Sequence, residues 1–318
     1  FDYHRVLFLC PVSYTFYIQN SENQHFVFKN VTYTKEDKKE YGNTLPNNVN
    51  SFENRLFKGK KTLYTITIPQ QMTLLCEDSF NYCTNLTSVV LSNVRRIETC
   101  CFDGCAFSSI LLPSTLEHLG DKAFNYCNCL SEITIPGSVT YIGSSCFWGC
   151  GLMTLVVERG VKYLSERCFE DCDYLSVIKI SNSVTSLGKS CFRGDIGIIG
   201  GRLPYNIKEI QSCCFYYCSS LERIILPKNL EYIGEAAFGD CENLIEIKIP
   251  EGVLELPKHC FGNCLQLSKV ELNNNIKRLG DMCFDYCKNL YEIELPESLT
   301  CIGKDCFLKQ CVLKKKKK

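Results

Sequence analysis

The sequence predicts a leucine-rich-repeat solenoid, an α/β repeat fold in which short parallel strands are joined by short helical or irregular turns. A phenylalanine returns at nearly fixed spacing along most of the chain, at Phe80, Phe102, Phe124, Phe147, Phe169, Phe192, Phe215, Phe238, Phe261, Phe284 and Phe307. The surrounding unit reads L-x-x-I-x-I-P-x-x-V-x-x-I-G-x-x-C-F-x-x-C-x-x and is usually 23 residues long. A period of about 20 to 29 residues with this leucine and isoleucine pattern is typical of such solenoids.

Seven apolar columns recur through the units and are expected to face the interior. In the first full unit they are Leu63, Ile66, Ile68, Met72, Leu75, Phe80 and Cys83. Ile66 and Ile68 alternate with Thr65 and Thr67, which predicts a short strand with one buried face. A proline column follows, where a missing amide hydrogen no longer weakens the ladder, so the strand should end there. A glycine column then precedes a segment such as 121–127, which is short enough for one or two helical turns.

The ends of such a stack need caps, because one unit buries too little apolar surface to offset the entropy lost on ordering it. We predict an N-terminal cap at 1–44, a solenoid of one degenerate and eleven full repeats at 45–313, and a lysine tail at 314–318. The degenerate repeat is marked by residues that lie 23 positions before column residues: Leu45, Pro46, Val49, Phe52, Phe57 and Leu63. Upstream, Val12–Ile18 and His25–Thr34 are predicted strands that cover the open end. Because the chain starts at Phe1, we expect a fragment or a processed product.

Charge and composition favour a protein partner over nucleic acid. Lysine plus arginine equals aspartate plus glutamate at 35 each, so the body without its terminal lysines is mildly acidic. We expect the tail Lys314–Lys318 to be solvated rather than to contact a membrane. No stretch approaches the roughly 18 apolar residues of a membrane span. Val6–Cys10 is a minor alternative as a signal remnant, and Asn30 and Asn85 begin weak glycosylation patterns.

The 24 cysteines are predicted to be mostly buried free thiols. Most fall in two columns, one directly before the phenylalanine and one three residues after it, and the first column interchanges with Ser79, Ala123 and Ala237. That exchange indicates a small buried side chain, a role that free cysteine fills. Disulfides between adjacent rungs are geometrically possible. Metal is a further alternative, because Cys101 and Cys105 would share a helical face. However, no histidine joins them and two thiolates do not complete a tetrahedral site. Free thiols suit a reducing compartment.

We find no catalytic residue, no cofactor site and no metal site in the sequence, and we predict that the protein is not an enzyme and takes no small-molecule substrate. The four histidines lie in unrelated contexts and no nucleophile or dinucleotide motif is present. Gly188-Lys189-Ser190 ends like a phosphate-binding loop but lacks the first glycine. Glu170 and Asp171 are interpreted as exposed and solvated.

The outward positions of the strands are the best candidates for binding. The middle residue is apolar or neutral in the early units, at Val90, Leu111, Thr134 and Val156, and charged in most later ones. Exposed apolar side chains on neighbouring strands can form a contact patch, although β-branched residues also simply suit a strand. A second column alternates in sign through Arg223, Glu246, Lys269 and Glu292 and is interpreted as a structural ladder. Tyrosines and Trp148 mark a possible second face on the turn side.

One unit, Leu130-Ser131-Glu132-Ile133-Thr134-Ile135-Pro136 with Ile142-Gly143 and Cys146-Phe147-Trp148-Gly149-Cys150, resembles the BspA-like class of leucine-rich repeats. The resemblance covers residues 45–313. The frequent cysteine before phenylalanine resembles the protozoan branch of that class, and Tyr33–Asp37 with Tyr41-Gly42-Asn43 resembles its lead-in segment. The resemblance implies a right-handed, non-catalytic solenoid of the kind found in surface antigens that bind matrix proteins or host cells. No ligand residues carry over, because the motif residues are structural.

We therefore predict a non-catalytic protein-recognition scaffold, with two alternatives for its setting. The resemblance implies the cell surface or plasma membrane, an adhesion role, and a matrix or host-cell protein as partner. The free-cysteine content favours the cytoplasm and an assembly scaffold.

Overall fold

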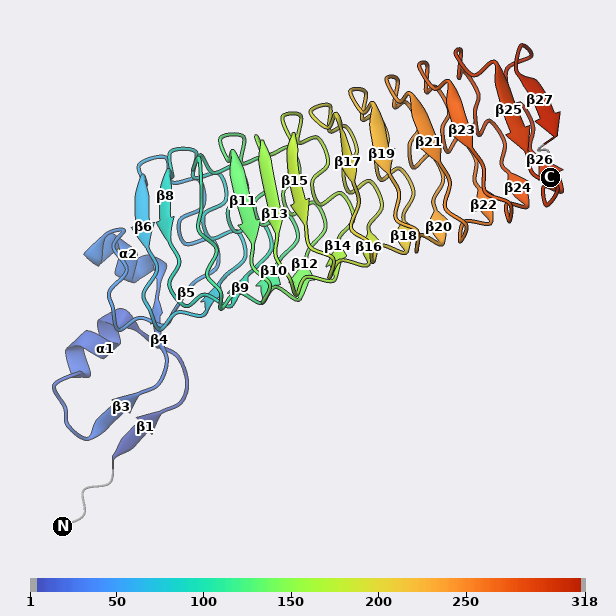
Figure 1. Cartoon of the computed structure of the whole chain (residues 1–318). Coiled ribbons are helices and arrows are strands. Elements are labelled where there is room, and N and C mark those ends of the chain that lie inside the picture. The colour runs from blue at the N-terminus through green and yellow to red at the C-terminus, as the bar shows by residue number, and fades with distance from the viewer. Residues whose placement is uncertain (1–4, 316–318) are drawn as a thin grey trace.

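Parallel strands, most of them paired with the equivalent strand of the next unit, build the elongated stack of Figure 1. This computed structural model describes residues 5–315. The predicted solenoid is confirmed, and the seven expected columns of the first unit are all buried. Because successive units pair in register, the same column faces the same side along the whole stack.

One ladder consists of strands three or four residues long, and we call it the long-strand ladder. Its members are β6 (Thr65–Thr67), β8 (Ser88–Val90), β11 (Glu132–Ile135), β13 (Thr154–Val157), β15 (Val177–Ile180), β17 (Gly200–Arg202), β19 (Arg223–Ile225), β21 (Glu246–Lys248), β23 (Lys269–Glu271), β25 (Glu292–Leu295) and β27 (Val312–Lys315). The ladder is interrupted, and its sheets are β6-β8, β11-β13-β15, β17-β19-β21-β23 and β25-β27. Alternate residues point inward and outward, as predicted.

A second ladder of two-residue strands was not predicted from the sequence. It contains β7 (Leu74–Leu75), β9 (Arg96–Ile97), β10 (His118–Leu119), β12 (Tyr141–Ile142), β14 (Tyr163–Leu164), β16 (Ser186–Leu187), β18 (Glu209–Ile210), β20 (Tyr232–Ile233), β22 (Glu255–Leu256), β24 (Arg278–Leu279) and β26 (Cys301–Ile302). We call it the short-strand ladder. The inward residue of nearly every pair is buried. Two residues are too few for a period of two to be recognised in a sequence.

The return segments around each phenylalanine are turns, which corrects the predicted helical turns. In every unit before the last, the residue two before the phenylalanine and the residue two after it adopt positive φ, as Lys122 and Tyr126 do at +55° and +51°. A right-handed helix does not accommodate such residues. The backbone bonds to the next unit instead: Phe124 N donates to Cys146 O at 2.8 Å and Phe147 N to Cys168 O at 2.9 Å. The return segment is therefore a third line of contact between rungs.

The phenylalanine rings form one continuous stack through the core. Adjacent rings from Phe57 to Phe307 lie 5.2–5.5 Å apart between centroids and are all stacked. All are buried except Phe307, in the last unit, which is half-buried. Leu45, Val49 and Phe52 of the degenerate repeat join the same core.

The N-terminal segment agrees with one of the two predicted strand regions, since His25–Thr34 contains two strands, and differs from the other, Val12–Ile18. It comprises β1 (Val6–Phe8), β2 (Val12–Ser13), α1 (Tyr14–Asn20), β3 (Phe26–Phe28), β4 (Val31–Tyr33), α2 (Lys35–Tyr41) and β5 (Ser51–Phe52). Val12–Ile18 is mostly helix because Ser13 caps it and Asp37 accepts the amides of Tyr14 and Thr15. Strands β2, β4 and β5 pair in order at the end of the stack.

The C-terminal end also requires a correction. Lys314 and Lys315, expected in a solvated tail, belong to β27 and pair with Glu294 and Leu295. Lys314 also forms an ion pair with Glu292. The rest of the predicted tail, 316–318, lies outside the described residues. Within residues 5–315, no helix is long and apolar enough to cross a membrane.

Candidate protein-binding face

The long-strand ladder places the four predicted contact residues on its outward side. Leu111 is the most exposed at 84%, Val90 is 49% exposed, Thr134 is exposed and Val156 is half-buried. Their inward neighbours, such as Ile110 and Leu112, are buried in the core, except Val89, which is half-buried. A substitution at the outward positions would therefore change the surface and leave the packing of the interior unchanged.

These four residues do not form one uninterrupted row. Thr134 and Val156 are direct register partners in β11 and β13, whereas Val90 pairs with Thr67 of β6. Leu111 lies between these two sheets, outside any strand, in a segment with an isolated bridge between Ser109 and Glu132. The unit that starts at Leu86 is two residues shorter than its neighbours, which shifts the following strand. The patch therefore consists of two paired sections with Leu111 at the break.

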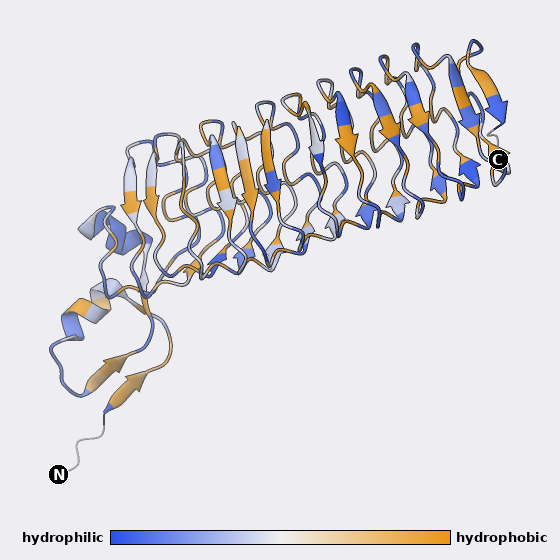
Figure 2. Ribbon diagram, viewed as in Figure 1, coloured by the Kyte–Doolittle hydropathy of each residue, from blue (hydrophilic) through white to orange (hydrophobic). Residues whose placement is uncertain are grey.

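Further exposed apolar side chains were not included in the prediction. Val177, Ile199 and Ile225 are 43%, 60% and 51% exposed and lie in or beside β15, β17 and β19. Ile225 occupies the same outward column as Val90, so its position in the repeat is the signal that identifies it. Figure 2 shows the hydropathy of the face changing along the stack: β6, β8 and β13 lack strongly hydrophilic segments, while β21, β23 and β25 contain them.

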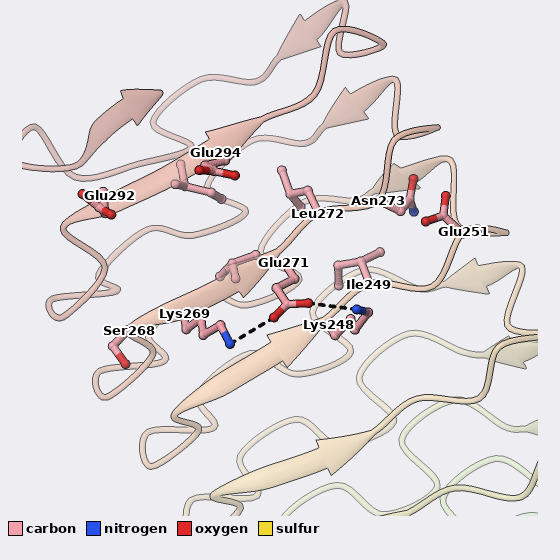
Figure 3. A pocket seen from close by; sticks show the side chains of 12 residues that line it. Lys248, Ile249, Glu251, Ser268, Lys269, Glu271, Leu272, Asn273, Glu292 and Glu294 are labelled. Atoms are coloured by element: carbon pink, nitrogen blue, oxygen red, sulfur yellow. Dashed lines mark ion pairs between the residues drawn. The ribbon is translucent and has the colours of Figure 1, made fainter. Parts of the chain in front are cut away.

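The charged half of this face is an ion-pair ladder, as predicted. Arg223 and Lys269 approach Glu246 at 3.2 and 3.9 Å. Glu271 lies 3.0 Å from both Lys248 and Lys269 (Figure 3), and hydrogen bonds from these two lysines lower the pKa of its carboxyl. A hollow of about 480 Å³ lies over this region. Because its central carboxylate is already held by two cations, the ladder favours strand pairing over capture of an ion.

The short-strand ladder carries an exposed aromatic row that sequence reasoning missed. His118 of β10 stacks on Tyr141 of β12, with centroids 4.5 Å apart and planes 7° from parallel. Burial and the nearby Arg96 lower the pKa of His118, and Glu98 lies 3.8 Å away. The stacking on Tyr141 gives His118 a structural role between two rungs. His259 lies 3.8 Å from Asp240 and is far along the chain from His118.

The turn side packs its aromatic residues against neighbouring rungs. The rings of Tyr82 and Tyr126 lie over Gly104 and Gly149 of the next unit. Trp148 contacts Tyr126 at 5.3 Å, and its Nε1 donates to Asp171 at 2.9 Å. Each of these contacts joins two neighbouring units, so Tyr82, Tyr126 and Trp148 have structural roles.

Glu170 corrects the expectation that the residues after the phenylalanine are solvated. Its carboxylate is buried at 4% exposure and lies 2.9 Å from Arg193 and 3.5 Å from Arg167. Burial raises the pKa of Glu170, and the two arginines oppose that rise. Asp171 is exposed, as expected.

The cysteine columns lie inside the stack. All 24 cysteines are free, and the members of both columns are almost all buried. Burial raises the pKa of Cys101, Cys146 and Cys191 well above the usual thiol range, which keeps them protonated. Among residues 5–315, no group of three or more histidine, cysteine, aspartate or glutamate side chains is arranged to hold a metal ion.

The repeating ladders, the stacked phenylalanines and an exposed strand face define a leucine-rich-repeat solenoid, a class of protein that binds other proteins. The family model of the BspA type leucine rich repeat region matches in six copies over residues 24–128, 95–222 and 208–317. The chain belongs to this family. Its repeats and solenoid fold are typical of non-enzymatic scaffolds.

Three bacterial proteins are among the solved structures to which this chain is similar. The pneumococcal vaccine antigen PcpA is 23% identical with a TM-score of 0.51, over 80% of this chain and 69% of that one. A leucine-rich repeat protein from Bacteroides ovatus is 25% identical with a TM-score of 0.40, over 85% and 88%. A leucine rich cell surface protein from Faecalibacterium prausnitzii is 18% identical with a TM-score of 0.44, over 96% and 89%. No curated protein matches the chain.

Proposed function

We propose that this protein is a non-catalytic recognition scaffold whose long-strand ladder binds another protein through Val90, Leu111, Thr134 and Val156. The observation that carries the proposal is the 84% exposure of Leu111 on a face whose neighbouring outward residues are also apolar or neutral. Exposed apolar side chains that become desolvated near the centre of an interface contribute most of its affinity. The ion-pair ladder at the other end of the face would then form its polar boundary.

We propose further that the setting is a cell surface and that the partner is an extracellular-matrix or host-cell protein. This rests on what the BspA-type resemblance implies. The second candidate is an intracellular assembly scaffold, and the specific observation that favours it is the presence of 24 free cysteines, because thiols persist in reducing compartments. Antibody labelling of intact, unpermeabilised cells separates the two, since only a surface protein is labelled before permeabilisation.

The binding test uses immobilised extracellular-matrix proteins and a lysine-substituted face. The variant Val90→Lys, Leu111→Lys, Val156→Lys should lose at least about tenfold in affinity, because three charges would have to be desolvated on binding. Its matched control is Val177→Lys, Ile199→Lys, Ile225→Lys, which puts the same charges further along the same face and should bind normally. Equal binding by both triple variants, with unchanged circular dichroism, would refute this location. Failure of the native protein to bind any matrix protein would refute the proposed partner class.

A further inference from the structure

A repeated hydrogen bond defines the chemistry of the cysteine column that follows the phenylalanine. In nine units the thiol donates to the carbonyl oxygen of the phenylalanine one unit earlier, at 3.0–3.3 Å: Cys83, Cys105, Cys127, Cys150, Cys172, Cys218, Cys241, Cys264 and Cys287. The column thus supplies one donor per rung to a carbonyl that faces the core.

Asp195 takes the cysteine position in the one middle unit that breaks this series. The equivalent acceptor, one unit earlier, is the carbonyl of Phe169. Asp195 is completely buried; its Oδ1 accepts the backbone amide of Cys172 at 2.8 Å, whereas its Oδ2 has no hydrogen-bond partner. An ionised carboxylate has no proton to give to a carbonyl, whereas a neutral carboxylic acid has one. Leaving the oxygen unpaired in the core would be costly.

The surroundings disfavour a negative charge at this position. The acidic groups facing Asp195 are Glu170, Asp171 and Asp173, and Glu170 already engages Arg167 and Arg193. The thiols that interact with it are Cys172, Cys191, Cys214 and Cys218, which remain neutral. Burial raises the pKa of Asp195 well above its usual range; the Cys172 amide opposes this and the three carboxylates reinforce it.

We propose that Asp195 is a neutral carboxylic acid in the folded protein, that its Oδ2–H donates to the carbonyl oxygen of Phe169, and that loss of this proton makes its rung the place where the stack opens. The acid thus replaces the cysteine thiol as donor while also accepting the Cys172 amide.

The same unit is weakened in two other ways, which is why opening would begin there. Gly201 stands in the inward column that Ile178 and Ile224 occupy in the neighbouring units. A Cβ added at Gly201 would have no neighbouring atom within 4 Å. The long-strand ladder is also interrupted between β15 and β17, as it is between β8 and β11 and between β23 and β25, so the coincidence with Asp195 and Gly201 is what distinguishes this rung. A stack of repeats is stabilised mainly by contacts between neighbours, so a loss at one rung separates the units on either side.

The sign of the pH effect follows from the raised pKa. Asp195 contributes its full stabilisation below the ordinary aspartate pKa of about 4, and this contribution is lost as the pH rises through the higher folded-state pKa. Between those two values each pH unit should reduce the folding equilibrium constant about tenfold. Asp195→Asn is the matched variant, because its amide donates and accepts at the same positions and does not titrate.

The experiment compares the full chain with Asp195→Asn in urea unfolding from pH 5 upward under reducing conditions. The ratio of folding constants, variant over native, should rise about tenfold per pH unit until the folded-state pKa is reached, and amide exchange should show the rung at 193–204 opening first. Parallel pH profiles would overturn the proposal. Infrared spectroscopy gives the direct readout: the native protein should show the band of a neutral carboxylic acid at neutral pH, and Asp195→Asn should lack it. If Asp195→Asn misfolds, Asp195→Cys takes its place. Absence of a difference would equally overturn it.

Discussion

The ring of Phe169 lies face to face with that of Phe147, with centroids 5.4 Å apart and planes 4° from parallel. Phe192 covers the opposite face of Phe169 at 5.5 Å. Each internal phenylalanine is thus enclosed by its counterparts in two neighbouring units, and the stack couples every rung to the next.

Removing one internal ring should be among the most destabilising single changes in the chain. Phe169→Ala is expected to lower the free energy of unfolding by about 3–5 kcal/mol, because it leaves a cavity between two rings. The control is Phe307→Ala, whose ring is half-buried and stacks only on Phe284, and whose loss should be clearly smaller. Urea unfolding measures both, and equal losses would contradict the idea that enclosure on two sides determines the cost.

Thiol reactivity should separate the cysteines by burial. In the native protein, exposed Cys10, Cys129 and Cys301 should react first with a thiol reagent, while the column cysteines stay protected. Denatured but unreduced protein should then react with nearly all 24 equivalents. A total below half of that number, in protein purified without air oxidation, would show that the columns form disulfides and would weaken the case for a reducing compartment.

A side chain at Gly149 should be destabilising, for two separable reasons. Its φ is +64°, and an added Cβ would lie 2.8 Å from the ring of Tyr126. Gly149→Ala is therefore expected to cost more than the roughly 1–2 kcal/mol of left-handed strain alone. Gly59→Ala is the matched control, since Gly59 has φ +68° and no neighbour within 4 Å. If thermal unfolding shows equal losses, the contact with Tyr126 contributes nothing.

Asp37 should make the N-terminal segment sensitive to acid. Burial opposes ionisation, but hydrogen bonds from Thr15 and Thr34 outweigh it and lower the pKa of Asp37. A lowered pKa means that the stabilisation is present above the unfolded value of about 4 and disappears as the pH falls through the folded value. Asp37→Asn should cost about 2 kcal/mol at neutral pH, and the difference should shrink in acid.

Unfolding of both proteins is measured at pH 7 and at pH 3 with a probe that reports on the N-terminal segment, such as the fluorescence of its clustered tyrosines. A constant difference between the two proteins across that range would show that the carboxylate charge at Asp37 is not involved. Glu36→Gln is a suitable control, because Glu36 is exposed on the same helix.

The repeat could be predicted from the sequence because one column residue, phenylalanine, recurs in every unit with its neighbours in fixed order. The short-strand ladder was not, since pairs such as Tyr141-Ile142 are strands only through their partners in other units. The return segments were misread as helical because left-handed residues such as Lys122 and Tyr126 have no distinctive side chain that would reveal their backbone conformation.

The outward residues of the candidate face could be predicted from the sequence only in part. Alternation in the strands identified Val90, Leu111, Thr134 and Val156 as outward, but it gave no indication that a shortened unit separates Val90 from Thr134. The burial of Glu170 and Asp195 was equally hidden, because it depends on partners about 23 residues away. The helix at Tyr14–Asn20 was missed because Asp37, which accepts amides at its start, lies three elements later.

The three lines of contact between rungs have a consequence for how proteins of this kind change length. Because every bond to the next unit is repeated at the same spacing, a whole unit of about 23 residues can be duplicated or lost while all remaining contacts keep their partners. Smaller changes have mixed effects: the two-residue shortening of the unit at Leu86 coincides with the gap between β8 and β11, whereas β11 and β13 pair fully although Glu132 and Thr154 lie 22 residues apart. Gene duplication can therefore alter the reach of the long-strand face in whole steps.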